Sequence, residues 1–182
     1  DALLDIFEPD MTSARLDVLF ADLKSWLPAL LASVVEKQSL NPPVAPQGPF
    51  PIAEQRELGL EAMRILGFDF DGGRLDISAH PFCGGVPQDV RITTRYNEED
   101  LLSALFGVIH ETGHARYEQN LPRKWLDQPV ALARSTAIHE SQSLFFEMQL
   151  GRSDAFLKRL LPAVRQRVGE QPAFSTENFI AW

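Results

Sequence analysis

The sequence predicts a mainly α-helical protein with one small β-hairpin or sheet. Apolar residues recur at three- and four-residue steps along several long segments, which is the pattern of helices with one buried face. Two short segments near glycine pairs instead alternate apolar and polar residues, as strands do. Hydrophobic residues make up 45% and charged residues 23% of the 182 positions, an ordinary balance for a globular chain rather than a disordered one.

The first expected helix covers about residues 12–37. Thr12 or Ser13 is suited to cap its start, and Pro28 should kink it or split it in two. We expect this helix to belong to a helical core, because its leucines and valines share one face: Leu16, Leu19, Leu23, Leu27, Leu30 and Val34. The proline-rich residues 41–52 then predict a stiff linker.

The remaining elements follow in order along the chain. A helix is expected over 53–66, ending at Gly67, and two strands at Arg74–Ser78 and Asp89–Tyr96 are expected to pair as a hairpin with a long loop. Further helices are expected over about 97–120, 129–150 and 153–168. The whole chain is interpreted as one domain: a helical segment over 1–40, the linker, and a core over 53–182.

Charge and cysteine content restrict the function. Lys and Arg number 17 and Asp and Glu 25, so the net charge is −8, and no basic block predicts a nucleic acid or an anionic membrane as a partner. The single cysteine, Cys83, excludes an intramolecular disulfide and a Cys-rich metal site, and it fits a reducing compartment. No stretch approaches the ~20 apolar residues of a membrane span. Both ends look cut, so we expect a piece of a longer chain.

The segment His110-Glu111-Thr112-Gly113-His114 carries the main chemical signal. Histidines at positions i and i+4 of a helix lie one turn apart on the same face, about 5–6 Å between Cβ atoms, so both imidazoles can reach one metal ion. Glu111 borders that site without having to bind the ion and can accept a proton from the attacking water. Unpaired histidine and glutamate on so apolar a helix would be costly to bury, which favours a metal site over a merely polar helix face.

A catalytic zinc usually has a third protein ligand. The downstream candidates are Glu118, His139, Glu140 and Glu147. Glu118 would crowd the same side of the ion, and spacing does not separate His139 from Glu140. A di-iron helical bundle is the remote alternative, but it needs a second ExxH unit, and Thr136 stands where the acidic residue before His139 would be.

Four motifs occur in a fixed order: His80-Pro81-Phe82, Asp89-Val90-Arg91-Ile92-Thr93, the HETGH segment, and His139-Glu140-Ser141-Gln142. This series resembles the carboxypeptidase Taq family of metallocarboxypeptidases, with its HPF, DxRxT, HExxH and HES-Q motifs. The similarity covers essentially the whole chain.

The resemblance implies a helical, zincin-like metallopeptidase core with a deep groove, and release of C-terminal amino acids from peptides. It assigns the metal ligands as His110, His114 and Glu140, and the general base as Glu111. It implies one divalent metal ion, zinc as the usual metal with cobalt as an alternative. The expected partners are peptides with a free C-terminus, and the expected protein is a cytoplasmic homodimer.

Two further family motifs, IRxxAD and GxxQDxHW, are absent from these 182 residues. We therefore expect an internal fragment that contains the metal site and lacks part of the substrate site. The alternative is a metal-binding fragment or degenerate member without turnover.

Four other motif residues are candidates for the substrate site or for the surroundings of the metal. Asp89 could orient a ligating imidazole or merely cap a turn, and Arg91 could pair with a substrate carboxylate or with a nearby acid. His80 could line the groove or be a satisfied loop histidine. His139, if it is not a ligand, is a candidate for contact with the substrate or with a ligand.

Overall fold

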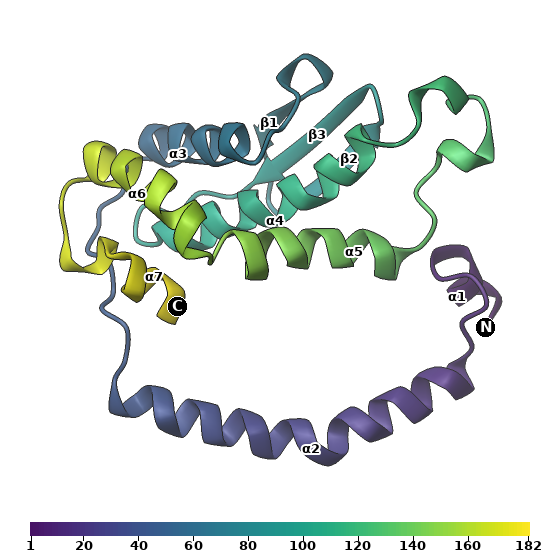
Figure 1. The fold of residues 1–182 in the computed structure, drawn as a ribbon, viewed down its shortest axis with the longest axis horizontal. Coiled ribbons are helices and arrows are strands. Elements are labelled where there is room, and N and C mark those ends of the chain that lie inside the picture. Colours follow the sequence, from purple (N-terminus) through teal and green to yellow (C-terminus); the bar gives the residue numbers. More distant parts are fainter.

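Seven helices and three strands make up the fold, in a computed structural model that describes residues 1–182 (Figure 1). Their bounds are α1 Ala2–Phe7, α2 Ser13–Leu40, α3 Ile52–Ile65, β1 Gly73–Ile77, β2 Phe82–Val86, β3 Asp89–Thr94, α4 Leu101–Gln119, α5 Thr136–Leu144, α6 Asp154–Val168 and α7 Thr176–Ala181. A π-helical segment, Phe145–Leu150, continues α5. The prediction of a mainly helical protein with one small sheet is confirmed.

The sheet has the strand order β1-β3-β2. β1 runs parallel to β3, with Leu75 opposite Ile92, so the predicted hairpin between these two segments is wrong. The antiparallel partner of β3 is β2, in which Cys83 lies opposite Ile92. β2 was not predicted, because Gly84 and Gly85, in its middle, are poor strand formers.

Helix α4 lies at the centre of the body, in contact with the sheet, α3 and α5. Two apolar clusters hold it there. One lies between α4 and the sheet: Met63, Phe68, Leu75, Val90, Ile92, Val108 and Ala115. The other joins α4 to α3, α6 and α7, with Leu105, Ile109, Leu157, Leu160, Phe174 and Phe179 among its members. The start of α4 is fixed by Asp100, whose side chain accepts a hydrogen bond from the backbone N–H of Ser103 at 3.0 Å.

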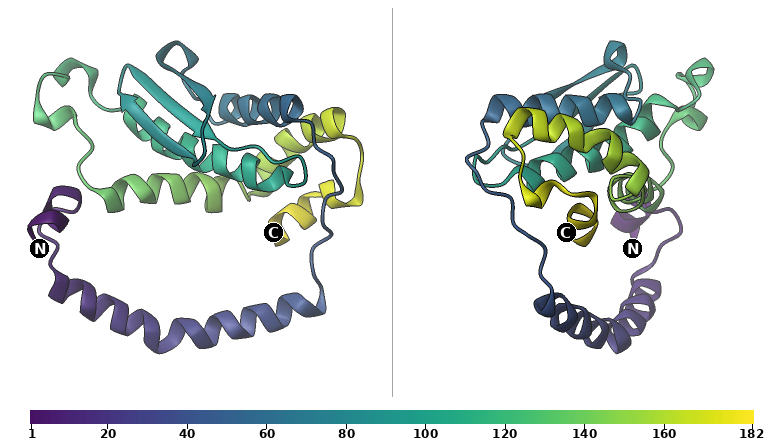
Figure 2. Two further views of the ribbon diagram at one scale, coloured as in Figure 1. Left: turned by 180° about the vertical axis from the view of Figure 1, so that it is seen from behind. Right: turned by 60° about the vertical axis from the view of Figure 1, so that its left-hand side comes forward.

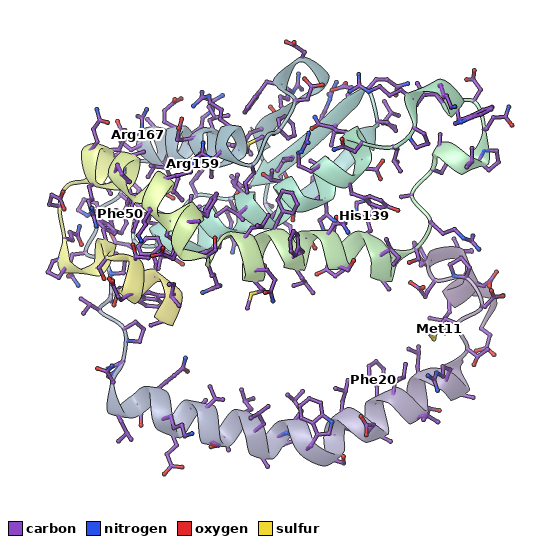
Figure 3. All side chains as sticks on the ribbon, in the orientation of Figure 1. Met11, Phe20, Phe50, His139, Arg159 and Arg167 are labelled. Atoms are coloured by element: carbon purple, nitrogen blue, oxygen red, sulfur yellow. The ribbon has the colours of Figure 1, made fainter.

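Helix α2 arches away from this body in every view (Figures 1 and 2). It begins at the predicted cap, Thr12, and continues through Pro28 without a break. None of its residues is buried, so the expectation that it forms part of a core is wrong for this chain; Phe20, labelled in Figure 3, is half exposed. The apolar face predicted from the leucine spacing therefore has no partner within residues 1–182.

By length and composition, α2 is also long and apolar enough to cross a membrane, contrary to the expectation that no segment would be. Core helices of soluble proteins and signal sequences share this property. The absence of a membrane partner stays a prediction.

Helix α5 starts at Thr136, later than the predicted 129: Pro129–Ala131 form one 3-10 turn, and residues 132–135 are not helical, with extended backbone at Leu132 and Ser135. Ser135 caps it by accepting from the N–H of Ile138 at 3.0 Å. The chain's first segment contributes as well: the Glu8 carboxylate accepts from the N–H of Ala137 at 2.9 Å, and the Thr136 hydroxyl donates to the Phe7 carbonyl at 2.9 Å. The first turn of α5 is thus held by residues more than a hundred positions earlier.

Candidate metal centre

Helix α4 presents His110 and His114 on one face. Their ring centroids are 5.1 Å apart, the separation expected for residues one helical turn apart. Both imidazoles are partly exposed, whereas Glu111 between them is buried. The apolar neighbours Val108, Ile109 and Ala115 are fully buried and fix this orientation of the helix.

Helix α5 packs against α4 and brings Glu140 to the two histidines. The Glu140 Oε2 atom lies 3.3 Å from Nε2 of His114 and 3.8 Å from Nε2 of His110. One ligand atom from each of the three residues lies within 4.8 Å of the others, so the three can share one metal ion. No second group of this kind occurs in the chain, so nothing in the structure favours a di-iron site.

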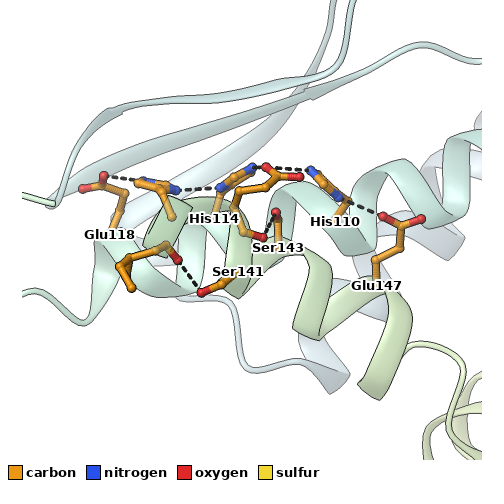
Figure 4. A network of polar contacts seen from close by, with 9 residues as sticks. His110, His114, Glu118, Ser141, Ser143 and Glu147 are labelled. Carbon is orange, nitrogen blue, oxygen red and sulfur yellow. Dashed lines mark hydrogen bonds and ion pairs between the residues drawn. The ribbon is translucent and has the colours of Figure 1, made fainter. Parts of the chain in front are cut away.

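The other three candidates for a third ligand lie outside this group of three (Figure 4). Two of them contact the Nδ1 atoms of His110 and His114, and the third, Glu118, contacts His139. Glu147 Oε2 is 2.9 Å from Nδ1 of His110. His139 Nδ1 is 2.6 Å from Nδ1 of His114, and His139 Nε2 is 2.8 Å from Glu118 Oε1. The Nε2 atoms of His110 and His114 therefore remain directed toward Glu140.

Burial sets the protonation of two residues at this site. Loss of solvent, the main effect, raises the pKa of Glu111 to about 7, with Glu140 nearby adding to the rise. Loss of solvent, together with the charges of His139 and His110, lowers the pKa of His114 to about 4. His114 is therefore neutral near pH 7, as a metal-ligating imidazole must be.

A cavity of about 480 Å³ opens beside these residues. Glu111, His114, His139 and Glu140 line one side of it. The rest of its wall comes from three other segments: Ile6 and Phe7, Pro81, Phe82 and Cys83, and Ala133, Arg134, Ser135 and Thr136. Of these residues, only Pro81 and Phe82 belong to a motif noted in the sequence, His80-Pro81-Phe82. Only tertiary packing brings these segments together, so no local sequence signal could have identified them all.

The structure does not bring His80, Asp89 and Arg91 to this cavity. Asp89 and Arg91 pair with each other on β3, with Arg91 Nη2 at 2.6 Å from Asp89 Oδ2, and this guanidinium lowers the pKa of Asp89. The side chain of His80 is exposed, and its backbone carbonyl accepts from Thr93 Oγ1 at 3.3 Å. Their suggested roles toward a ligand or substrate stay predictions that this geometry does not support.

Cys83 lines the cavity but is a poor nucleophile. Burial, reinforced by the charges of Glu111 and Glu118, raises the pKa of its thiol to about 12. We predict that the metal-free protein reacts with iodoacetamide at pH 8 more slowly than free cysteine does, by roughly 10³-fold, because so little thiolate is present. Mass spectrometry of the alkylated protein measures this rate, and the unfolded chain, which should react like free cysteine, is the control. Equal rates in the two states would contradict the prediction.

The chain is similar to known metallocarboxypeptidases in both sequence and structure. A family model described as "Carboxypeptidase Taq (M32) metallopeptidase" matches residues 1–182. Among curated relatives, Carboxypeptidase 1 of Bacillus subtilis is 46% identical over 157 residues, which are 86% of this chain and 31% of the relative. Thermostable carboxypeptidase 1 of Thermus thermophilus is 41% identical over 180 residues, 98% of this chain and 35% of the relative.

Among solved structures, Metallocarboxypeptidase 1 of Trypanosoma cruzi superposes with a TM-score of 0.90 at 53% identity, covering 98% of this chain and 36% of that one. The chain thus spans about a third of the length of these relatives.

Proposed function

Because the chain belongs to the carboxypeptidase Taq (M32) family of metallopeptidases, we propose that it supplies the metal centre of a carboxypeptidase that removes C-terminal residues from peptides. In this proposal His110, His114 and Glu140 hold the metal, and Glu111 is the general base. The observation that carries the proposal is the convergence of three ligand atoms within 4.8 Å beside a buried glutamate that faces a cavity.

Zinc is the metal that this donor set favours. Two imidazole nitrogens and one carboxylate oxygen are a common catalytic zinc set, and ligands about 2.0–2.1 Å from a tetrahedral zinc lie about 3.4 Å from each other. The separations of 3.3 and 3.8 Å between Glu140 and the two imidazoles suit this geometry. Cobalt, with similar ligand preferences, is the alternative. A divalent ion held here supplies Lewis acidity and makes water a stronger acid.

Glu111 is suited to move the proton. It lines the cavity next to His114 and Glu140, and in the metal-free protein burial raises its pKa to about 7. A bound cation would lower this pKa and keep the carboxylate ionised, as a general base must be. The carboxylate can accept a proton from water that attacks a peptide carbonyl and can later deliver it to the leaving amine. Both transfers take place in the partly buried site.

Two features of the cavity wall favour an extended peptide with a free C-terminus. β2 is an edge strand with one unpaired side, and its first residues, Phe82 and Cys83, line the cavity, so a peptide could pair along it. Arg134 is the one Lys or Arg in the wall and makes no ion pair with another side chain, whereas Arg91 is occupied by Asp89. Arg134 is therefore a better candidate than Arg91 for contact with a substrate carboxylate.

The activity is tested on a protein of the relatives' length that contains this chain, loaded with zinc or cobalt. Peptides with free C-termini should lose residues from that end, and the same peptides with amidated C-termini should not. Equal cleavage of both would contradict the assignment as a carboxypeptidase. Hydrolysis of neither by the loaded protein would favour the alternative, a metal-binding member without turnover. The cytoplasmic location and homodimeric assembly stay predictions of the family resemblance.

Metal binding is tested separately, in the same protein of the relatives' length. We predict that His110→Ala removes stoichiometric zinc binding, because the two remaining protein ligands bind the ion much more weakly than three do. Metal content after gel filtration measures the loss. His80→Ala is the matched control, since His80 is exposed and outside the cavity, and it should keep one zinc per chain. Full zinc content in His110→Ala would contradict the ligand assignment.

A further inference from the structure

His110 and His114 differ in the group that contacts Nδ1, the ring nitrogen that does not face Glu140. His110 Nδ1 meets a carboxylate directly, Glu147 Oε2 at 2.9 Å. His114 Nδ1 instead meets a second imidazole, His139, at 2.6 Å, and the far nitrogen of His139 meets Glu118 at 2.8 Å. These polar side chains form a spatial row between α4 and α5, with Glu118 at one end and Glu147 at the other (Figure 4). His114 is therefore connected to a carboxylate through an intervening ring.

When His114 binds a metal through Nε2, one placement of the protons gives every hydrogen-bond donor from His114 to Glu118 an acceptor. That nitrogen must then be unprotonated, so the proton of the neutral ring is on Nδ1 and is donated to Nδ1 of His139. His139, accepting at Nδ1, carries its own proton on Nε2 and donates it to the ionised Glu118. Every donor then meets an acceptor, and neither ring carries a charge.

Packing holds the intermediate ring in place. The ring of Tyr117 meets that of His139 edge-on, with centroids 5.0 Å apart, and the His114 ring lies 4.7 Å from it on another side. About a fifth of the His139 side chain and a quarter of that of Glu118 are exposed, so water competes only partly for these contacts. His139 and Glu118 are thus packed, and only partly exposed to water, beside the predicted ligand.

We propose that Glu118 and His139 are a positioning pair that fixes the tautomer and the orientation of His114 for metal binding. The inference rests on the proposed function, since it assigns His114 as a ligand. His139 would then not bind the metal itself, although the sequence leaves that open. Partners of this kind typically contribute about 10–100-fold to metal affinity.

The test measures the zinc affinity of a protein of the relatives' length that contains this chain, by competition with a chelator and in the absence of substrate. His139→Phe should weaken binding about 10–100-fold, because its ring fills the space without accepting a hydrogen bond. His139→Gln should recover much of the loss, since its amide can accept from His114 and donate to Glu118. Tyr117→Phe is the control: it keeps the ring that packs on His139 and should bind zinc like the parent chain.

A double-substitution cycle tests whether the two residues act on His114 together. Glu118→Leu should also weaken zinc binding, and combined with His139→Phe it should add little further loss, because both act through one ring. Nitrogen NMR of the metal-free chain should show the His114 proton on Nδ1 and show this preference reduced in His139→Phe. Circular dichroism verifies that each variant keeps its helices.

The outcomes separate the two proposals. Parent-like zinc affinity in folded His139→Phe, or additive losses in the cycle, would overturn the positioning pair and leave the proposed function intact. Failure of a protein of the relatives' length that contains this chain to bind zinc at all would overturn the proposed function and this inference with it.

Discussion

Glu111→Gln is expected to keep the metal and to lower peptide hydrolysis by about 10²–10⁴-fold. Glutamine has nearly the same shape as glutamate but cannot accept a proton at neutral pH, so the step that activates water loses its base. Because His110, His114 and Glu140 are untouched, zinc content should remain one per chain. The measurement is kcat/KM on a peptide with a free C-terminus, in a protein of the relatives' length, beside metal analysis of the same sample.

The matched control for this experiment is Glu177→Gln. Glu177 lies in the first turn of α7, outside the cavity, and its loss should leave kcat/KM unchanged. Near-normal turnover by zinc-loaded Glu111→Gln would remove Glu111 from the mechanism. Loss of zinc from that variant would instead mean that Glu111 contributes to holding the ion.

Gly113→Ala is expected to destabilise the fold and to weaken zinc binding, although an HExxH pattern permits any residue at this position. A Cβ atom there would lie 2.6 Å from Cα of Ser143 and 2.7 Å from the carbonyl oxygen of Gln142. These are backbone atoms of α5, so the two helices would have to move apart. Overpacking of this kind typically costs about 1–3 kcal/mol, and it would shift Glu140 away from the two histidines.

Gly107→Ala provides a sharp comparison within the same helix. A Cβ atom at Gly107 would meet nothing closer than Thr94 Oγ1 at 3.9 Å. Alanine is a better helix former than glycine, so this variant should be more stable by roughly 0.5–1 kcal/mol and bind zinc normally. Urea denaturation and chelator competition measure both effects. A Gly113→Ala protein as stable as Gly107→Ala would show that the close approach of α4 and α5 is not required.

Elements with strong local signals were predicted well. α3, α4 and α6 each have a helical apolar period, and Gly67 marks the end of α3. The start of α4 was placed too early, near residue 97, because the acidic residues before Leu101 lie outside the helix and Asp100 caps it. The pairing of β1 with β3 was not predicted correctly, because parallel pairing depends on how the chain crosses over and not on either strand's own residues. The exposure of α2 was missed for a similar reason: periodicity predicts an apolar face but not what covers it.

The site was predictable to the extent that it lies on one helix. The i, i+4 spacing fixes His110 and His114 on one face, whatever the rest of the fold does. The third position was left open because His139 and Glu140 are adjacent, and only the packing of α5 on α4 turns Glu140 toward the pair. The contact of Glu147 with His110 depends on the same packing, across 37 residues of sequence.

The cap that Glu8 places on the first turn of α5 has a consequence for the timing of assembly. Residue 8 leaves the ribosome 129 residues before Ala137, its partner. At roughly 5–20 residues per second, this interval lasts about 6–26 s. The pair of histidines on α4 is also synthesised before Glu140. A metal ion that arrives during synthesis would therefore meet two of the three proposed ligands first, and Glu140 would complete the set only after α5 has emerged.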